Sequence, residues 1–458
     1  MSSTRGIIDL DSLSQMVRND EIDTVIVAFP DLYGRLMGKR FDAEFFLKSV
    51  ATHGTHACDY LLTVDMEMEP ISGYEFSNWN SGYGDFHLVP SMDTLRVLPW
   101  QEKTAFVMCD VENDEDHELI RPAPRSILKR QVELAKELNF EIKAASELEY
   151  FIFQNDYADL AKNDYRELNP TSQYIQDYHI MQATREEPLH AIARRQMKEA
   201  GVPVESTKGE WGKGQHELNL EYCDALEMSD RHVLLKQGMK EIADSMGVSV
   251  TFMAKYSQQQ AGSSCHIHLS LWNGETNAFV GDSAYGTFKC SDAFRWFLGG
   301  WIRRVPELMV FFAPNVNSYK RYQAGSWAPT NLAVSQDNRT AGFRIVGTGP
   351  SLRVECRIPG ADVNPYLAYA AAIAAGMDGI RNQIEPPEVF QGNAYDESTN
   401  RVPTTFHEAV ALFATSEFAA YAFGQDVFEH YRHFFQTEIE AYNNAVTDWE
   451  RVRYFERI

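Results

Sequence analysis

Residues 315–357 read NVNSYKRYQAGSWAPTNLAVSQDNRTAGFRIVGTGPSLRVECR, and the interpretation of the chain starts from this segment. It holds five arginines in a protein that is acidic overall, and six glycines and prolines divide it into short pieces. Arginines at turns and strand ends suit planar oxyanions such as carboxylates and phosphates. Surface ion pairs are the ordinary explanation for any single arginine. The segment ends in an alternating strand pattern in which Glu355 and Arg357 share a face, and this favours a binding site.

The length, composition and net charge of the sequence limit the class of protein that it can form. The chain has 458 residues, 44% of them hydrophobic, which is enough for one large fold or two to three domains. Its net charge of −23 argues against nucleic acid and anionic membranes as partners. Six cysteines are scattered without a CxxC pair, which is typical of reduced thiols. The N-terminus resembles no signal peptide, and no apolar run approaches the ~18 residues of a membrane span, so we expect a cytoplasmic protein.

Hydrophobic periodicity and turn signals predict an α+β fold, with an antiparallel sheet covered by helices. We expect a small N-terminal domain over residues 1–112 and a larger domain over 113–458, with the acidic, proline-containing segment 112–124 as the linker. Residues 58–88 are expected to be mostly loop. The expected helices cover residues 8–20, 43–54, 124–138, 188–201, 228–247, 291–312, 364–382, 405–414 and 425–446. The expected strands cover residues 23–29, 35–41, 94–98, 104–110, 140–153, 249–254 and 265–272.

Acidic side chains recur at strand-like spacing outside the arginine segment. Glu147 and Glu149 would lie on one face of a strand, where like charges repel unless a cation or solvent relieves them. Glu210 and Glu217 flank a glycine-rich turn, so adjoining strands can bring them together. A solvated outer face and a charged hairpin tip are the ordinary explanations, and the buried-type residues around Glu147 weaken the first of them.

A histidine pair adds nitrogen donors to this set. His266 and His268 share a strand face, although a lone HxH is a weak zinc signal and is more often a pair of core histidines. Beside several carboxylates, including Glu355, one imidazole favours hard cations such as Mg²⁺ or Mn²⁺. Cations next to an arginine cluster are the electrostatic apparatus of phosphoryl transfer. The sequence has no Walker A or GxGxxG motif, so a P-loop would not hold the nucleotide.

These motifs, in this order, resemble the glutamine synthetase family across essentially the whole chain. The resemblance implies a β-grasp N-terminal domain, a glutamine synthetase-type catalytic domain, and a dodecamer of two stacked hexameric rings with sites shared between subunits. The matching residues are Glu147-x-Glu149, Glu210…Gly214-Gln215-x-Glu217, Gly262…His266-x-His268-x-Ser270-x-Trp272, Asn317-Ser-Tyr-Lys-Arg321, Asn338-Arg339…Arg344, Arg353-Val-Glu355-Cys-Arg357 and Asn364-Pro365-Tyr366.

The resemblance also implies a role for each matched residue. Two or three Mg²⁺ or Mn²⁺ ions would be held by Glu149, Glu210 and Glu217, and by Glu147, His266 and Glu355. ATP would contact Glu205, Tyr222, His268, Ser270, Trp272, Arg344 and Arg353. L-Glutamate would be bound by Gly262, Arg321 and Arg357. Arg339 would stabilise the phosphoryl group during its transfer.

The sequence departs from the family pattern mainly at positions where glutamine synthetases bind ammonium, the nucleophile of their reaction. The flap position six residues after the NSYKR motif normally carries glutamate and here is Trp327, which offers an apolar wall or a cation–π face to an organic amine. Ala261 stands where the family often has asparagine. Asp59 and Asp65 are the candidates for the ammonium-site aspartate. These departures and the chain end, residues 448–456, resemble the glutamate–amine ligase branch, which makes γ-glutamylamides from ethanolamine, polyamines, alkylamines or arylamines.

We therefore predict an ATP-dependent ligase that joins the γ-carboxylate of L-glutamate to a primary organic amine through γ-glutamyl phosphate. Asp59 or Asp65 would accept the proton of the amine. One alternative is an ammonia-using glutamine synthetase with a variant flap, and another is a catalytically silent member with a structural or nitrogen-sensing role. Tyr395 falls near the tyrosine that some synthetases adenylylate and is a candidate for regulation.

Overall fold

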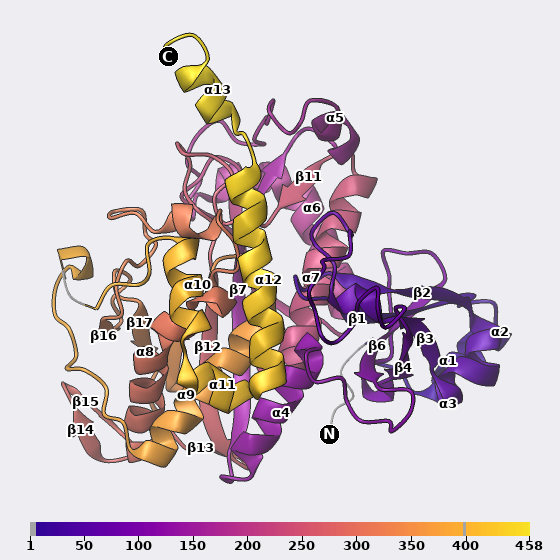
Figure 1. Ribbon diagram of the computed structural model, residues 1–458, viewed down its shortest axis with the longest axis horizontal. Coiled ribbons are helices and arrows are strands. Elements are labelled where there is room, and N and C mark those ends of the chain that lie inside the picture. The colour runs from indigo at the N-terminus through magenta and orange to yellow at the C-terminus, as the bar shows by residue number, and fades with distance from the viewer. Residues whose placement is uncertain (1–5, 397–399) are drawn as a thin grey trace.

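The N-terminal part of the chain forms a six-stranded sheet, drawn in indigo and violet at the right of Figure 1. The computed structural model describes residues 6–396 and 400–458. The strand order is β2–β1–β6–β4–β3, with β5 on the side of β6. β1 and β6 are parallel, with Thr24 opposite Thr104, and the other pairs are antiparallel. The strands are β1 Thr24–Pro30, β2 Leu36–Asp42, β3 Thr55–Cys58, β4 Asp85–Pro90, β5 Arg96–Val97 and β6 Thr104–Glu112.

The helices of this part follow the sequence signals closely. In α1 (Leu10–Arg18), Asp9 accepts a hydrogen bond from the backbone N–H of Ser12 at 2.8 Å and so caps the first turn. Residues 43–53 are helical throughout, as α2 (Ala43–Phe45), a wider turn η1 (Phe46–Val50) and α3 (Ala51–His53). The prediction of mostly loop for residues 58–88 missed the start of β4, because glycines dominate the local pattern there.

The larger part is built on a ten-stranded sheet with the order β16–β17–β18–β12–β7–β9–β8. β10 and β11 also pair with β7, and β13 pairs with β12. The sheet is not wholly antiparallel as expected, because its edge pair β16–β17 is parallel. The strands are β7 Glu141–Phe153, β8 Val204–Gly209, β9 Gln215–Leu220, β10 Cys223–Asp224, β11 Ser249–Thr251, β12 Cys265–Asn273, β13 Thr276–Asn277, β16 Val334–Gln336, β17 Phe343–Val346 and β18 Arg353–Cys356, beside a separate pair β14 Ser283–Tyr285 and β15 Phe288–Cys290.

Helices pack against this sheet and against each other, with α12 running along the front of the larger part and α13 projecting at the top (Figure 1). α8 and α9 approach closely at Gly300 and Gly379, where a Cβ on Gly300 would lie 2.5 Å from the Gly379 Cα. α6 begins at residue 180 instead of 188, since it accommodates Pro188 in its interior. The helices are α4 Pro124–Lys136, α5 Tyr157–Lys162, α6 Ile180–Glu199, α7 Ala225–Ser245, α8 Asp292–Phe312, α9 Pro365–Asn382, α10 Phe406–Ala414, α11 Glu417–Phe423, α12 Gln425–Asn444 and α13 Asp448–Tyr454, with short 3₁₀ turns η2 Asp59–Leu62, η3 Met92–Thr94, η4 Ser318–Arg321, η5 Gly349–Ser351 and η6 Ala394–Asp396.

The two parts are joined through buried charges. Arg125, at the start of α4, forms ion pairs with Asp110 of β6 and with Asp230 of α7, the latter at 3.0 Å. The segment expected to be a linker is partly ordered as a hairpin, because Glu112 and Leu119 form a β-bridge. Within the described ranges, none of the helices has the length and apolar character needed to cross a membrane.

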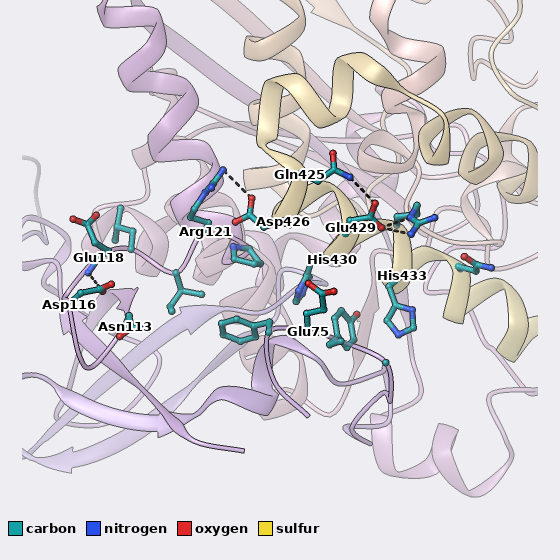
Figure 2. A pocket seen from close by; sticks show the side chains of 18 residues that line it. Glu75, Asn113, Asp116, Glu118, Arg121, Gln425, Asp426, Glu429, His430 and His433 are labelled. Carbon is teal, nitrogen blue, oxygen red and sulfur yellow. Dashed lines mark hydrogen bonds and ion pairs between the residues drawn. The ribbon is translucent and has the colours of Figure 1, made fainter. Parts of the chain in front are cut away.

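A cavity of about 1040 Å³ lies between the N-terminal part and α12 (Figure 2). Asp116 and Glu118 line it from the hairpin, and Asp426, Glu429 and His433 line it from α12. None of the site residues expected from the sequence lines this cavity. It is therefore separate from the candidate active site described next.

Candidate active site

The first acidic cluster forms where β7 pairs with β9. Glu149 on β7 lies opposite Glu217 on β9, and Glu210 comes from the turn between β8 and β9. Their carboxylate oxygens lie within 4.8 Å of one another. Burial, and next the charge of Glu147, raise the pKa of Glu217 to about 9, and burial followed by Glu210 raises that of Glu149. The carboxylates repel one another, and nearby positive charge does not balance them fully. A divalent cation bound by their oxygens would remove this repulsion.

One lysine lies within this cluster. Lys208 of β8 forms an ion pair with Glu210, and its Nζ lies 3.7 Å from the carboxylate of Glu217. The same ammonium lies over the ring of Tyr178, 4.6 Å from its centroid. Burial disfavours the charged lysine, but Glu217 and Glu210 outweigh burial and raise its pKa. The lysine ammonium thus faces two of the three carboxylates of the cluster.

The second cluster forms at the other edge of β7, where this strand pairs with β12. Glu147 is opposite His266 of β12, and His268 of β12 is opposite Glu355 of β18. The His266 Nδ1 lies 3.0 Å from Glu147 and 3.5 Å from Glu355, and the His268 Nε2 lies 3.0 Å from Glu147. Burial opposes the ionisation of Glu147, yet the imidazoles of His268 and His266 hold its pKa well below the usual range. The structure thus adds His268, which the resemblance assigned to the nucleotide, to the residues that could hold a cation.

Arginines from the 315–357 segment surround Glu355, which is fully buried. Arg344 lies opposite it in the β17–β18 register and donates a hydrogen bond at 2.8 Å, and Arg357 donates another at 2.7 Å. Despite burial, the charge of Arg357, and next those of His266 and His268, hold the pKa of Glu355 at about 2. Arg353 donates a hydrogen bond from Nε to the Nδ1 of His268 at 3.2 Å, so three arginines adjoin the second cluster.

A cavity of about 430 Å³ opens onto both clusters. Arg321 and Arg357 line it, and their buried Nε donors have no hydrogen-bond partner among the described residues. Such orphaned guanidinium donors suit a carboxylate ligand. Gly262 makes room for Arg321, because a Cβ there would lie 2.4 Å from the Arg321 Cγ. The exposed side chain of Arg339 lines the same cavity.

Of the seven expected ATP residues, Arg344 lines this cavity, and Glu205, Tyr222, His268, Ser270, Trp272 and Arg353 do not. Glu205 and Tyr222 are exposed on β8 and just after β9, and Tyr222 is 66% exposed. Ser270 and Trp272 lie further along β12, where the Trp272 Nε1 donates a hydrogen bond to the Ser270 hydroxyl at 2.9 Å. Glu205, Tyr222, Ser270 and Trp272 therefore lie on or next to strands of the site, but they are not gathered around the carboxylates.

Aromatic side chains form one end of the cavity. Trp327 is 47% exposed, and its ring packs edge to face on Trp211, with 6.0 Å between the ring centroids. Tyr178 and Asp177 line the same cavity. Trp327, Tyr178 and Asp177 all have positive φ, of 63°, 45° and 24°, a conformation that is uncommon for residues other than glycine. Trp211, Tyr178 and Asp177 were not expected at the site from the sequence, where the one signal for them is the position of Trp211 directly after Glu210.

The two expected aspartates do not line the cavity of their own chain. Asp59 accepts a hydrogen bond from the hydroxyl of Ser77. Asp65 stabilises a turn by accepting hydrogen bonds from the backbone N–H groups of Glu67 and Glu69, at 3.0 and 2.8 Å. Neither carboxylate therefore belongs to the site that its own chain forms.

Tyr395 turns its hydroxyl inward. The oxygen is buried without a hydrogen-bond partner among the described residues. Burial raises its pKa, while the nearby charges of Arg357 and Arg321 oppose the rise. This orientation argues against Tyr395 as a target for a modifying enzyme and places its hydroxyl beside the orphaned arginines.

Comparisons with known proteins agree with this geometry. Residues 121–454 match the family "Glutamine synthetase, catalytic domain". The chain is 45% identical to gamma-glutamylethanolamide synthetase GlnA4 from Streptomyces coelicolor, covering 98% of this chain and 96% of the relative. It is 36% identical to a glutamate–isopropylamine ligase from a Pseudomonas species, covering 96% and 97%.

Among solved structures, the chain resembles the "GmaS/ADP complex-Conformation 1" with a TM-score of 0.84 and 28% identity, over 97% of this chain and 99% of that one. The match covers the carboxylate clusters, the arginine segment and the helices around them. Enzymes of the matched family use ATP and divalent metal ions. We conclude that this chain belongs to the glutamine synthetase family.

Proposed function

We propose that this protein is a glutamate–amine ligase, which uses ATP to join the γ-carboxylate of L-glutamate to a primary organic amine. The observation that carries the proposal is the pair of indoles, Trp211 and Trp327, beside the carboxylate clusters in one cavity. An indole can cover an alkyl group or the face of an organic ammonium, but it gives no charge pair to ammonium itself. The relatives named for ethanolamide and isopropylamine ligation support an organic amine as the nucleophile.

The reaction has two chemical steps. The γ-carboxylate oxygen of glutamate attacks the terminal phosphorus of ATP, so that γ-glutamyl phosphate forms and ADP leaves. The neutral amine then attacks the acyl carbon, the bond to the phosphate oxygen breaks, and inorganic phosphate and a proton are released. We assign Arg321 and Arg357 to glutamate, since their buried Nε donors have no partner among the described residues, and Gly262 leaves room for Arg321. Arg339 would neutralise the phosphoryl group in transfer.

The donor sets fit divalent cations of the Mg²⁺ or Mn²⁺ kind. We assign Glu149, Glu210 and Glu217 to one ion, because their carboxylate oxygens lie within 4.8 Å of one another. We assign Glu147, His266 and Glu355 to another, because the His266 Nδ1 lies 3.0 Å from Glu147 and 3.5 Å from Glu355. When bound, such ions would balance the charge of the phosphates and of the developing acyl phosphate. Arg344 and Arg353, with Glu205, Tyr222, His268, Ser270 and Trp272, remain our assignment for the nucleotide.

The amine must lose its charge before it can attack. Contact with the indoles of Trp327 and Trp211 would remove water from the ammonium and lower its pKa. Asp177 is the one acidic residue outside the two clusters among the described residues that line the cavity, so it is a proton acceptor within the same chain. Asp59 or Asp65 could serve only from a neighbouring subunit.

Ammonia is the second candidate nucleophile, and Asp177 is the observation that favours it. A carboxylate beside the indoles could pair with a small ammonium ion, as the missing flap glutamate would. Two binding free energies decide between the nucleophiles. One is that of an alkyl group against the indoles, and the other is that of an ammonium ion against the carboxylate of Asp177.

The organisation of the protein follows as part of the same proposal. We propose a β-grasp N-terminal domain over residues 1–112 and a catalytic domain over 113–458, assembled as a dodecamer in which neighbours complete each site. Support comes from the separate six-stranded sheet and from the position of Asp59 and Asp65 away from the cavity of their own chain. The reduced state of all six cysteines supports a cytoplasmic location.

Product analysis tests the function. The purified enzyme would be supplied with ATP, L-glutamate, Mg²⁺ or Mn²⁺, and either NH₄⁺ or one member of a panel that contains ethanolamine, isopropylamine, putrescine and aniline. We expect a γ-glutamylamide with at least one organic amine at a higher kcat/KM than glutamine formation from NH₄⁺. Faster turnover with NH₄⁺ than with every amine would make the protein a glutamine synthetase.

A further inference from the structure

A cluster of nitrogen and oxygen donors in the N-terminal sheet lies outside the active site. It consists of His87 on β4, Glu112 at the end of β6, and His117 in the hairpin that follows. Their donor atoms lie within 4.8 Å of one another. His87 and Glu112 are directly opposite in the β4–β6 register, so their side chains share one face of the sheet.

The hydrogen bond of the Nε2 atom determines which tautomer His87 adopts. Its Nε2 lies 2.7 Å from the carbonyl oxygen of His53, so Nε2 carries the proton and donates it. Gly54 allows this approach, because a Cβ there would lie 2.3 Å from the Nε2. Nδ1 is therefore left with a free lone pair, and it is buried without a hydrogen-bond partner among the described residues. Donation of the other N–H to a backbone carbonyl is the usual arrangement of a metal-binding histidine.

The hairpin holds His117 in an unusual conformation. Its φ is 59°, and backbone hydrogen bonds from its N–H to the Asn113 carbonyl at 3.0 Å and from the Asn113 N–H to the Glu118 carbonyl at 2.9 Å fix the turn. The ring centroid of His117 lies 6.1 Å from that of His87. Positive φ in a histidine is uncommon, and here it directs the imidazole toward the other two donors.

The charge of the surroundings favours a cation. Residues 112–118 read ENDEDHE and carry five acidic side chains. One of them, Asp114, already holds a neighbouring histidine, since its Oδ1 lies 2.8 Å from the Nε2 of His56. The ring of His56 stacks on His87 with 5.0 Å between centroids.

From these observations we infer that His87, Glu112 and His117 form a binding site for a divalent transition metal of the zinc class. Two imidazole nitrogens and one carboxylate suit zinc better than magnesium, and a fourth position would remain for water. In a tetrahedral zinc site the donors are roughly 3.3 Å apart, given metal–ligand distances of about 2.0–2.1 Å. Rotation of the exposed His117 side chain can close the present separation. The ion would fasten the hairpin to β4 and β6.

Cobalt spectroscopy on the full-length protein tests this site. Chelator-treated enzyme would be titrated with Co²⁺ in excess Mg²⁺, which competes for the carboxylate clusters of the active site. We expect one equivalent of Co²⁺ with the intense visible absorption of four-coordinate cobalt, displaced by Zn²⁺. His117→Asn, whose side chain tolerates positive φ, and Glu112→Gln should each weaken binding at least tenfold. His56→Asn, outside the triad, is the matched control and should keep the signal.

Thermal unfolding gives a second readout. Zn²⁺ should raise the Tm of the wild-type protein and of His56→Asn, because a ligand that binds only the folded state stabilises it, and should leave the Tm of His117→Asn and Glu112→Gln unchanged. Ligase activity of the variants with Mg²⁺ should match that of the wild type. The inference is overturned if both variants bind Co²⁺ as the wild type does, or if the wild type shows only the weak absorption of six-coordinate cobalt.

Discussion

Replacing Trp327 with alanine removes one wall of the aromatic end of the cavity, where we propose that the amine binds. A tryptophan side chain buries about 150–250 Å² when covered, and Trp327 is 47% exposed, so about 100 Å² remains for a substrate to cover. At about 25 cal/mol per Å², the most that an amine can gain there is about 2.5 kcal/mol. A small alkyl group that covers half of this area gains about 1.2 kcal/mol. That value predicts a loss of roughly eightfold in kcat/KM for such an amine.

Alanine is the suitable replacement because both residues carry a Cβ, so the cost of the positive φ at this position stays the same. The assay is steady-state phosphate release with isopropylamine, and hydroxylamine is the control because it has no carbon chain to contact the indole. We expect the isopropylamine kcat/KM to fall and the hydroxylamine value to stay within twofold. Trp211→Ala should act in the same direction, since its ring supports Trp327. Equal losses for both nucleophiles, or none for either, would refute the reasoning.

Three further perturbations follow from the same structure. Trp327→Glu places a carboxylate at the flap position and should raise the kcat/KM for NH₄⁺ relative to isopropylamine, measured in competition; an unchanged ratio would contradict the role of the indole. Arg339→Ala should lower kcat by about 10²–10³, because the lost charge acts mainly on the phosphoryl group in transfer, while calorimetry should show glutamate binding with nearly unchanged affinity. Burial lowers the pKa of His190 to about 4 and that of His430 to about 3, so each resists a proton that the unfolded chain accepts near pH 6.5. The free energy of unfolding should therefore fall as the pH drops below about 6.5, by ~1.4 kcal/mol per pH unit for each histidine, and His430→Asn should show a shallower slope in denaturant titrations.

Much of the active site could be predicted because it depends on short-range rules. The two-residue period of a strand puts Glu147 and Glu149 on one face, and the glycine-rich turn lets β8 and β9 pair, which brings Glu217 close to Glu210. The order of motifs then linked them to Glu355. The first two features are local, whereas the link to Glu355 rests on the resemblance to the glutamine synthetase family.

The rest depends on long-range register and on loop conformation. His268 meets Glu147 and Glu355 because β12 lies between β7 and β18 in a particular register, which spacing along the chain does not encode. The contact between Trp211 and Trp327 requires a loop residue at positive φ, a conformation that propensity does not assign to tryptophan. The early start of α6 was missed for a related reason, since packing outweighs the local preference of a proline.

The position of Lys208 bears on how the acidic cluster is stabilised when no cation is bound. Its ammonium already sits against Glu210 and near Glu217, so the newly made chain carries an internal counter-ion at the place of greatest repulsion. The strands can therefore adopt their register with the lysine as counter-ion, and a cation held by Glu210 and Glu217 would take the place of its ammonium group.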